Sequence, residues 1–163
     1  MVTIRESGMV FGEFPEDCVF KIENSNTHKI VGDGVKTVEF VYLQAKNKLL
    51  FVEAKSSSPR YDTSIERYYE FIDEITDKFV HSFEMYMALK LRRYEELSEK
   101  LATVDDSDMK YRFILVINGH KNDWLLPIQE ELKIKLRYHH NIWKSEVVAI
   151  NEQTAKSWNL TTT

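Results

Sequence analysis

Two short apolar runs that each contain a glutamate constrain this chain more than any other feature of its sequence. The runs, 37–43 and 48–54, are separated by polar turn residues and are predicted to form a β-hairpin. Glu39 lies inside the first run and Glu53 inside the second, where a strand packed against helices usually carries valine or isoleucine. A buried charge is costly unless it is paired or binds a metal. The hairpin is therefore expected to carry an ion pair or a metal site.

The register of this hairpin decides whether the two carboxylates meet. Side chains repeat every second residue along a strand, so Glu53 and Lys55 share one face. A two-residue loop would pair Glu39 with Ala54 and leave the carboxylates on opposite faces, whereas a three-residue loop ending in Asn47 would place them directly opposite each other. Asparagine tolerates a positive φ better than most residues, which favours the three-residue loop. We therefore expect two carboxylates and one ammonium group to converge.

Such a cluster suits the metal-assisted hydrolysis of phosphodiesters. Mg²⁺ and Mn²⁺ prefer oxygen ligands, and they commonly bind through one or two carboxylates together with a substrate phosphate. A neighbouring lysine can orient or deprotonate a metal-bound water, or stabilise the charge of the transition state. The sequence thus predicts Glu39 and Glu53 as metal ligands and catalytic residues, with Lys55 as a third catalytic residue.

An acid in one strand, a hairpin, and an apolar strand ending in E-x-K resemble the pattern of the PD-(D/E)XK nuclease superfamily, which has the restriction-endonuclease-like fold. Glu53-Ala54-Lys55 matches the (D/E)-x-K element, and Glu39 lies 14 residues earlier, where the aspartate of the family falls. The chain departs from the family in having Val38-Glu39 in place of Pro-Asp, which keeps the charge but lengthens the side chain. The resemblance covers about residues 10–150 and implies a magnesium-dependent nuclease acting on DNA.

The resemblance also implies further residues near the metal. An acid from the N-terminal part often completes the site in this superfamily, and the candidates are Glu13, Glu16 and Glu23, among which the sequence does not choose. The helix after the E-x-K strand often presents a polar residue toward the site, and Lys78 and His81 are suitably placed. A lysine beside an apolar stripe is more often a surface residue, so neither is assigned to the core of the site.

The order of predicted elements indicates the fold class. Residues 1–17 contain three breakers and are expected to be irregular, and a long helix begins at Thr63 and continues to about Leu101, with a bend or break near 89–93 as the alternative. The continuous apolar run 111–117 is typical of a central strand covered on both faces. Further expected elements are a first strand over 18–22, a helix over 124–136 capped by Asn122 or Asp123, a strand over 146–150 and a short helix capped by Asn151. This order predicts one α/β domain over 1–163, with helices flanking a mixed sheet that contains an antiparallel hairpin.

Composition and charge bear on location and partners. The single cysteine rules out an internal disulfide, and without a signal peptide or a long apolar span the chain is expected to be cytoplasmic with no membrane partner. The net charge of −4 argues against a generally basic surface. However, the acid-free segment 132–143 contains Lys133, Lys135 and Arg137 and is followed by Lys144, and these four residues form the predicted nucleic-acid contact. A solvated helix end is the alternative interpretation of that segment.

Three interpretations of function remain open at this point, the third being a small interaction subunit whose exposed aromatic residues mediate dimerisation. In the first, the chain is a metal-dependent endonuclease or exonuclease. In the second, it is an inactive module of the same fold that binds nucleic acid or a protein partner, with Glu39, Glu53 and Lys55 reduced to a structural ion pair. A homodimer is a reasonable expectation in either case, because a single domain of this size covers few base pairs.

Overall fold

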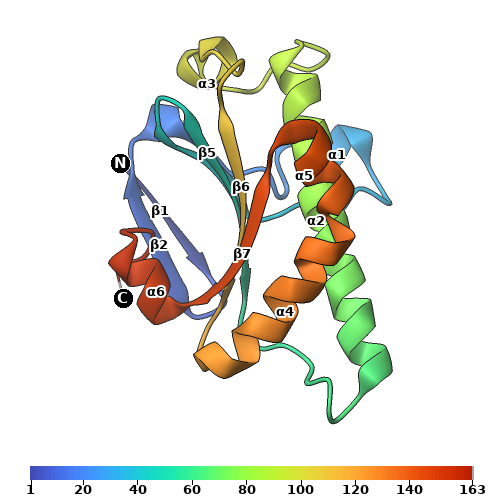
Figure 1. Cartoon of the computed structure of the whole chain (residues 1–163). Coiled ribbons are helices and arrows are strands. Elements are labelled where there is room, and N and C mark those ends of the chain that lie inside the picture. Colours follow the sequence, from blue (N-terminus) through green and yellow to red (C-terminus); the bar gives the residue numbers. More distant parts are fainter. Residues whose placement is uncertain (163) are drawn as a thin grey trace.

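A five-stranded mixed sheet forms the centre of the computed structural model, which describes residues 1–162 (Figure 1). Its order is β3 (Val19–Phe20), β4 (Phe40–Ala45), β5 (Lys48–Lys55), β6 (Lys110–Ile117) and β7 (Glu146–Asn151). The first three strands are antiparallel neighbours, whereas β5, β6 and β7 are parallel. The predicted α/β class with a mixed sheet and an antiparallel hairpin is therefore confirmed, as is the central strand over 111–117.

Helices cover one face of this sheet. Figure 1 shows α2 (Ile65–Lys90), α4 (Asn122–Lys135) and α5 (Arg137–Trp143) on the same side of the strands. Phe79 of α2 stacks on Phe113 of β6 with ring centroids 4.9 Å apart, and both rings are fully buried. Burying side chains of this size against the sheet is the main stabilisation of a helix as long as α2.

The opposite face is covered by the N-terminal hairpin and the C-terminal helix. β1 (Val2–Glu6) pairs with β2 (Met9–Phe14), and α6 (Glu152–Ser157) lies beside them (Figure 1). Aromatic side chains such as Phe11 pack against the sheet here. The expectation of an irregular segment over 1–17 was thus wrong, because the glycines that suggested breaks occupy a tight turn and a buried strand position.

Other boundaries also differ from the predicted ones. The first strand is two residues long, the 3₁₀ helix η1 (Glu16–Cys18) precedes it, and α1 (Asn26–Val31) follows. α4 begins at Asn122 itself, with Lys121 at the N-cap position and no side-chain cap, so capping by Asn122 or Asp123 was wrong. The segment after α4 forms the helix α5, which had been expected as a loop. The cap of α6 by Asn151 is confirmed, because its side chain accepts a 3.0 Å hydrogen bond from the Thr154 amide.

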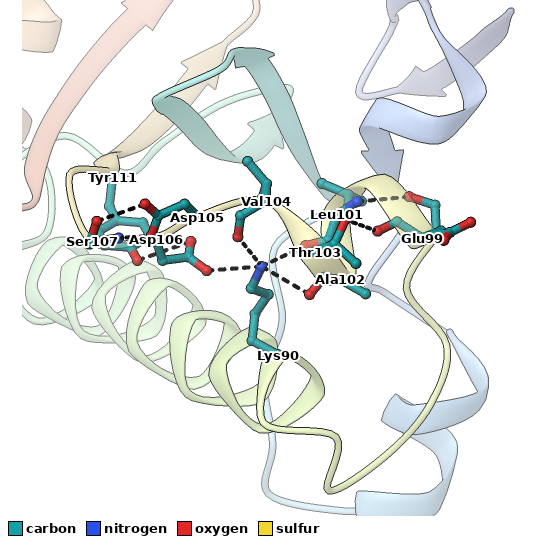
Figure 2. A network of polar contacts seen from close by, with 11 residues as sticks. Lys90, Glu99, Leu101, Ala102, Thr103, Val104, Asp105, Asp106, Ser107 and Tyr111 are labelled. Atoms are coloured by element: carbon teal, nitrogen blue, oxygen red, sulfur yellow. Dashed lines mark hydrogen bonds and ion pairs between the residues drawn. The ribbon is translucent and has the colours of Figure 1, made fainter.

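The long helix ends earlier than predicted. α2 stops at Lys90, the chain turns at Arg92 with a φ of 57°, and the short helix α3 (Glu99–Thr103) follows. Figure 2 shows how the Lys90 ammonium group holds this region together. It donates to the carbonyl oxygens of Leu101, Ala102 and Val104 at 2.8, 3.3 and 2.7 Å, and it pairs with Asp106 at 3.0 Å. The alternative of a break near 89–93 is therefore confirmed, although no glycine or proline marks the position.

Candidate metal and catalytic site

The hairpin register brings Glu39 and Glu53 onto one face of the sheet. The loop is a two-residue one, with Ala45 paired to Lys48, and Asn47 does not have a positive φ, so the expected three-residue loop was wrong. A one-residue shift in pairing lies between Leu43 and Ala45, and beyond it the strands are in the register that places Glu39 opposite Glu53. A bulge thus produces the register that the longer loop had been expected to produce.

Both glutamates face the helical layer. Val41 and Phe51 lie two residues from Glu39 and Glu53 along the strands and therefore share their face, and both belong to the core beneath α2. Glu39 is 6% exposed and Glu53 is fully buried. Lys55 lies on the same face as Glu53, two residues further along β5. The two carboxylates and the ammonium group therefore converge under α2, at the carboxyl end of β5.

The Glu53 carboxylate is bound through one of its two oxygens. Lys78, which projects from α2, approaches Oε1 of Glu53 at 2.8 Å, and the Lys55 ammonium lies 3.5 Å from the same atom. Lys55 also pairs with Glu74 of α2 at 3.3 Å. Oε2 of Glu53 is buried and has no hydrogen-bond partner among residues 1–162. One buried carboxylate oxygen thus remains available to a ligand.

Glu39 belongs to a cluster of acids on the other side of this site. Glu6 ends β1 and Glu23 lies in the turn after β3, and one ligand oxygen from each lies within 4.8 Å of the others and of one from Glu39. The neighbouring Glu23 carboxyl group favours the protonated form of Glu39 and so raises its pKa. Oε2 of Glu39 is a second buried oxygen for which the described part of the chain supplies no partner.

Burial and neighbouring charges shift the pKa values of these groups. Burial is the main reason that the pKa of Glu39 rises from 4.5 to about 8, and the neighbouring Glu23 carboxyl group and the charge of Glu53 add to it. Burial also raises the pKa of Glu53, although Lys78 and Lys55 oppose the shift. Burial lowers the pKa of Lys78, but the charge of Glu53, its hydrogen bond with Lys78 and the charges of Glu23 and Glu39 together outweigh burial, and the net direction is upward.

The structure separates the predicted N-terminal acids. Glu13 and Glu16 are exposed and lie outside the cluster, whereas Glu23 is part of it, although in a turn and not in a strand. Glu6 was not predicted, because residues 1–17 had been expected to be irregular. Lys78 lies in the site, although it had not been assigned to its core. His81 instead accepts a hydrogen bond from the Lys36 amide at 3.1 Å.

The predicted nucleic-acid segment is divided by acids from elsewhere in the fold. Lys133 pairs with Glu130 at 3.4 Å, and Lys135 pairs with Asp73 of α2 at 3.0 Å. Arg137 and Lys144 form no ion pair with any described residue. Lys144 precedes the amino end of β7, so it lies at the opposite edge of the parallel strands from Lys55. The segment therefore does not extend the carboxylate site directly.

Four carboxyl groups and two ammonium groups thus meet in one largely buried site. Ligands of one octahedral Mg²⁺ ion are about 2.9 Å apart when adjacent and about 4.2 Å apart when opposite, so Glu6, Glu23 and Glu39, whose ligand oxygens lie within 4.8 Å of one another, would move closer together to share an ion. No protein-family model, curated protein or solved structure matches the chain, so its chemistry is inferred from these residues. Within residues 1–162, no helix is long and apolar enough to cross a bilayer.

Proposed function

We propose that this protein is a metal-dependent nuclease that hydrolyses phosphodiester bonds in DNA, with Glu39 and Glu53 as ligands of Mg²⁺ or Mn²⁺. The observation that carries the proposal is the pair of unpartnered buried oxygens, Oε2 of Glu39 and Oε2 of Glu53, on neighbouring strands. An unsatisfied buried polar atom costs about 1–3 kcal/mol, and more when it is charged. A cation bound between the two side chains would remove that cost.

The residues of the site have distinct roles in this proposal. A bound Mg²⁺ would polarise the scissile phosphate and acidify a water molecule. Glu39 and Glu53 would hold the ion, and Glu23 and Glu6 would supply further oxygens. Lys55, at the rim of the site, would stabilise negative charge on the phosphate during attack. Lys78 would keep the buried Glu53 ionised and fix its orientation, so it is a positioning residue.

The element order supports the same proposal. A strand and an antiparallel hairpin lead into the long helix α2, and a strand, a helix and a further strand follow, as the resemblance to PD-(D/E)XK nucleases implies. The E-x-K residues lie at the carboxyl end of β5, which is parallel to β6. In open sheets of this kind, ligands bind at the carboxyl ends of parallel strands.

One observation favours the second interpretation, an inactive module that binds nucleic acid or a protein. The 2.8 Å contact between Lys78 and Glu53 is the geometry of a stable ion pair, and Lys55 adds a second ammonium group to the same oxygen. In that case the lysines would neutralise Glu53 permanently, and no metal would be needed.

Metal binding and DNA cleavage by three variants separate the two proposals. We expect Mn²⁺ binding by calorimetry and Mg²⁺-dependent cleavage of plasmid or single-stranded DNA. Glu53→Gln should abolish both, and Lys55→Met should keep metal binding but slow cleavage on the order of 10²–10³-fold. Glu16→Gln changes an exposed acid outside the cluster and is the matched control.

Two outcomes would overturn the nuclease proposal. Cleavage that survives both Glu53→Gln and Lys55→Met would show that the activity resides elsewhere. A native protein that binds no Mn²⁺ and cleaves neither DNA would favour the inactive module.

A further inference from the structure

A second polar pocket lies at the opposite edge of the sheet from the carboxylates. It forms where the amino ends of β5 and β6 approach the end of α5, and its volume of about 850 Å³ is within the usual range for small-molecule sites. Three lysines and two aromatic residues contribute to its lining: Lys48, Lys110, Lys144, Tyr111 and Trp143.

The charges of this pocket are not balanced by the fold. Lys48 and Lys110 are direct partners in the β5–β6 ladder, and like charges placed this way destabilise a sheet. No acid in residues 1–162 pairs with either of them or with Lys144. Of the acids that line the pocket, Glu146 lies 3.9 Å from Arg112 and Asp106 is taken by Lys90, which leaves Asp108 alone. The three lysines therefore create a site for an anion.

Trp143 adds an aromatic surface to this site. Its ring packs against Phe83 with centroids 4.7 Å apart and lies near His139 at 6.4 Å, which fixes its orientation. The residue is nevertheless 42% exposed and lines the pocket. An indole that is held in place with part of its surface free suits the stacking of a nucleic-acid base.

One wall of the pocket is held rigid by the Lys90 network. Besides the contacts of Lys90, the Asp105 carboxylate accepts hydrogen bonds of 2.9 Å from the backbone amide and the hydroxyl of Ser107 (Figure 2). Tyr111 donates a 3.2 Å hydrogen bond to Asp106, which joins the wall to β6. A wall that is already ordered loses little conformational entropy when a ligand binds.

We propose that this pocket binds a nucleoside phosphate, with the base on Trp143 and the phosphates on Lys48, Lys110 and Lys144. Phosphate oxygens would neutralise the facing lysines, and the aromatic ring explains why a base accompanies the phosphate. The ligand is either a free nucleotide or the terminal nucleotide of a strand, since both present the same chemistry. The site shares no residue with the carboxylate cluster and goes beyond the proposed nuclease function.

Binding measurements in EDTA test this pocket apart from metal chemistry. The probes are ATP and a short single-stranded DNA with a 5′-phosphate. Calorimetry and quenching of tryptophan fluorescence measure their binding. The Lys110→Gln/Lys144→Gln double variant should bind about 100-fold more weakly, since a hydrogen bond to a charged group contributes roughly a factor of ten. Trp143→Phe should remove the quenching. Lys156→Gln, an exposed lysine of α6, is the matched control.

The pattern of binding identifies the ligand. Tight binding of ATP that depends on the lysines supports a free nucleotide, and binding of the strand alone supports a strand end. The proposal would be overturned if neither probe bound, or if the double variant bound the probes as tightly as the native protein. Glu53→Gln should bind both probes as the native protein does, so failure of the nuclease proposal would leave this result intact.

Discussion

At the scale of single residues, the raised pKa of Glu39 couples metal binding to protons. With a pKa of about 8, Glu39 is mostly protonated at pH 7, and a metal must displace that proton in order to bind. We expect Mn²⁺ binding at pH 7 to release close to one proton per ion and to tighten as the pH rises toward 8. Calorimetry in buffers of different ionisation enthalpy measures this release. Binding without proton release would contradict the assignment of Glu39 as a ligand.

The same group makes stability depend on pH in the absence of metal. Since the folded pKa lies above the ordinary value of 4.5, the folded state retains a proton that the unfolded chain loses, and stability falls as the pH rises from 4.5 to 8. Glu39→Gln should remove this loss, which amounts at most to roughly 4 kcal/mol at pH 8. Urea unfolding at pH 5 and pH 8 tests it. An equal pH dependence in both proteins would contradict the expectation.

Lys78 and Glu53 provide a second residue-scale prediction. Lys78→Met leaves the fully buried Glu53 without its closest partner, and breaking one side of a buried pair typically costs about 3–5 kcal/mol. The Lys78→Met/Glu53→Gln double variant should recover part of that loss, because no charge is left buried. Denaturant unfolding of both variants measures the difference. A double variant less stable than Lys78→Met would contradict this account.

At the scale of elements, the bulge before the β4–β5 loop leads to an unexpected prediction. Leu43 pairs with Leu49 and Ala45 with Lys48, so Gln44 is the extra residue. Deleting Gln44 should leave a regular ladder and keep Glu39 opposite Glu53, because core burial and not loop length sets the register. We expect Mn²⁺ affinity to stay within about threefold of native, a difference of less than 1 kcal/mol. Loss of binding would show that the bulge itself positions Glu39.

The junction between α2 and α3 depends on one ammonium group. Lys90→Met would leave three carbonyl oxygens and Asp106 without their donor, at a cost of about 2–3 kcal/mol. Faster amide exchange over 101–106 should accompany the loss, since Lys90 binds four groups of this segment. The matched control is Lys100→Met, a lysine with a more exposed side chain whose ion pair is 3.6 Å long. Equal effects of the two substitutions would contradict the role of Lys90.

At the scale of the whole molecule, a metal would tie together four separate parts of the chain. Glu6 ends β1, Glu23 follows β3, Glu39 precedes β4 and Glu53 lies in β5. Binding to the folded state alone stabilises it, by about 2.7 kcal/mol at a metal concentration of 100 times the Kd. We expect Mn²⁺ to raise the melting temperature of the native protein, and to do so less for Glu23→Gln. An equal shift in the two proteins would place the ion elsewhere.

Sequence reasoning predicted those parts of the fold that local patterns encode. The apolar runs of β5 and β6, with bulky residues such as Phe51 and Phe113 on the helical face, defined the sheet. The pairing of Glu39 with Glu53 was predicted from a three-residue loop, whereas the fold produces it with a two-residue loop and a bulge. Glu6 could not be found, because its approach to Glu39 depends on how the N-terminal hairpin folds over the sheet. α2 begins at Ile65, within two residues of its predicted start at Thr63, and its end at Lys90 lies in the segment 89–93 that the sequence offered as an alternative break.

The placement of the two polar sites at opposite ends of β5 has a consequence for product length. Lys48 and Lys55 are about 23 Å apart at the usual rise of a strand, which equals about seven nucleotide steps of B-form DNA. If the lysine pocket holds the end of a DNA strand while the carboxylates cut it, the distance between the two sites sets the length of the product. Fragments of one uniform size would then accumulate, whereas a ladder of sizes would mean that the two ends of β5 work separately.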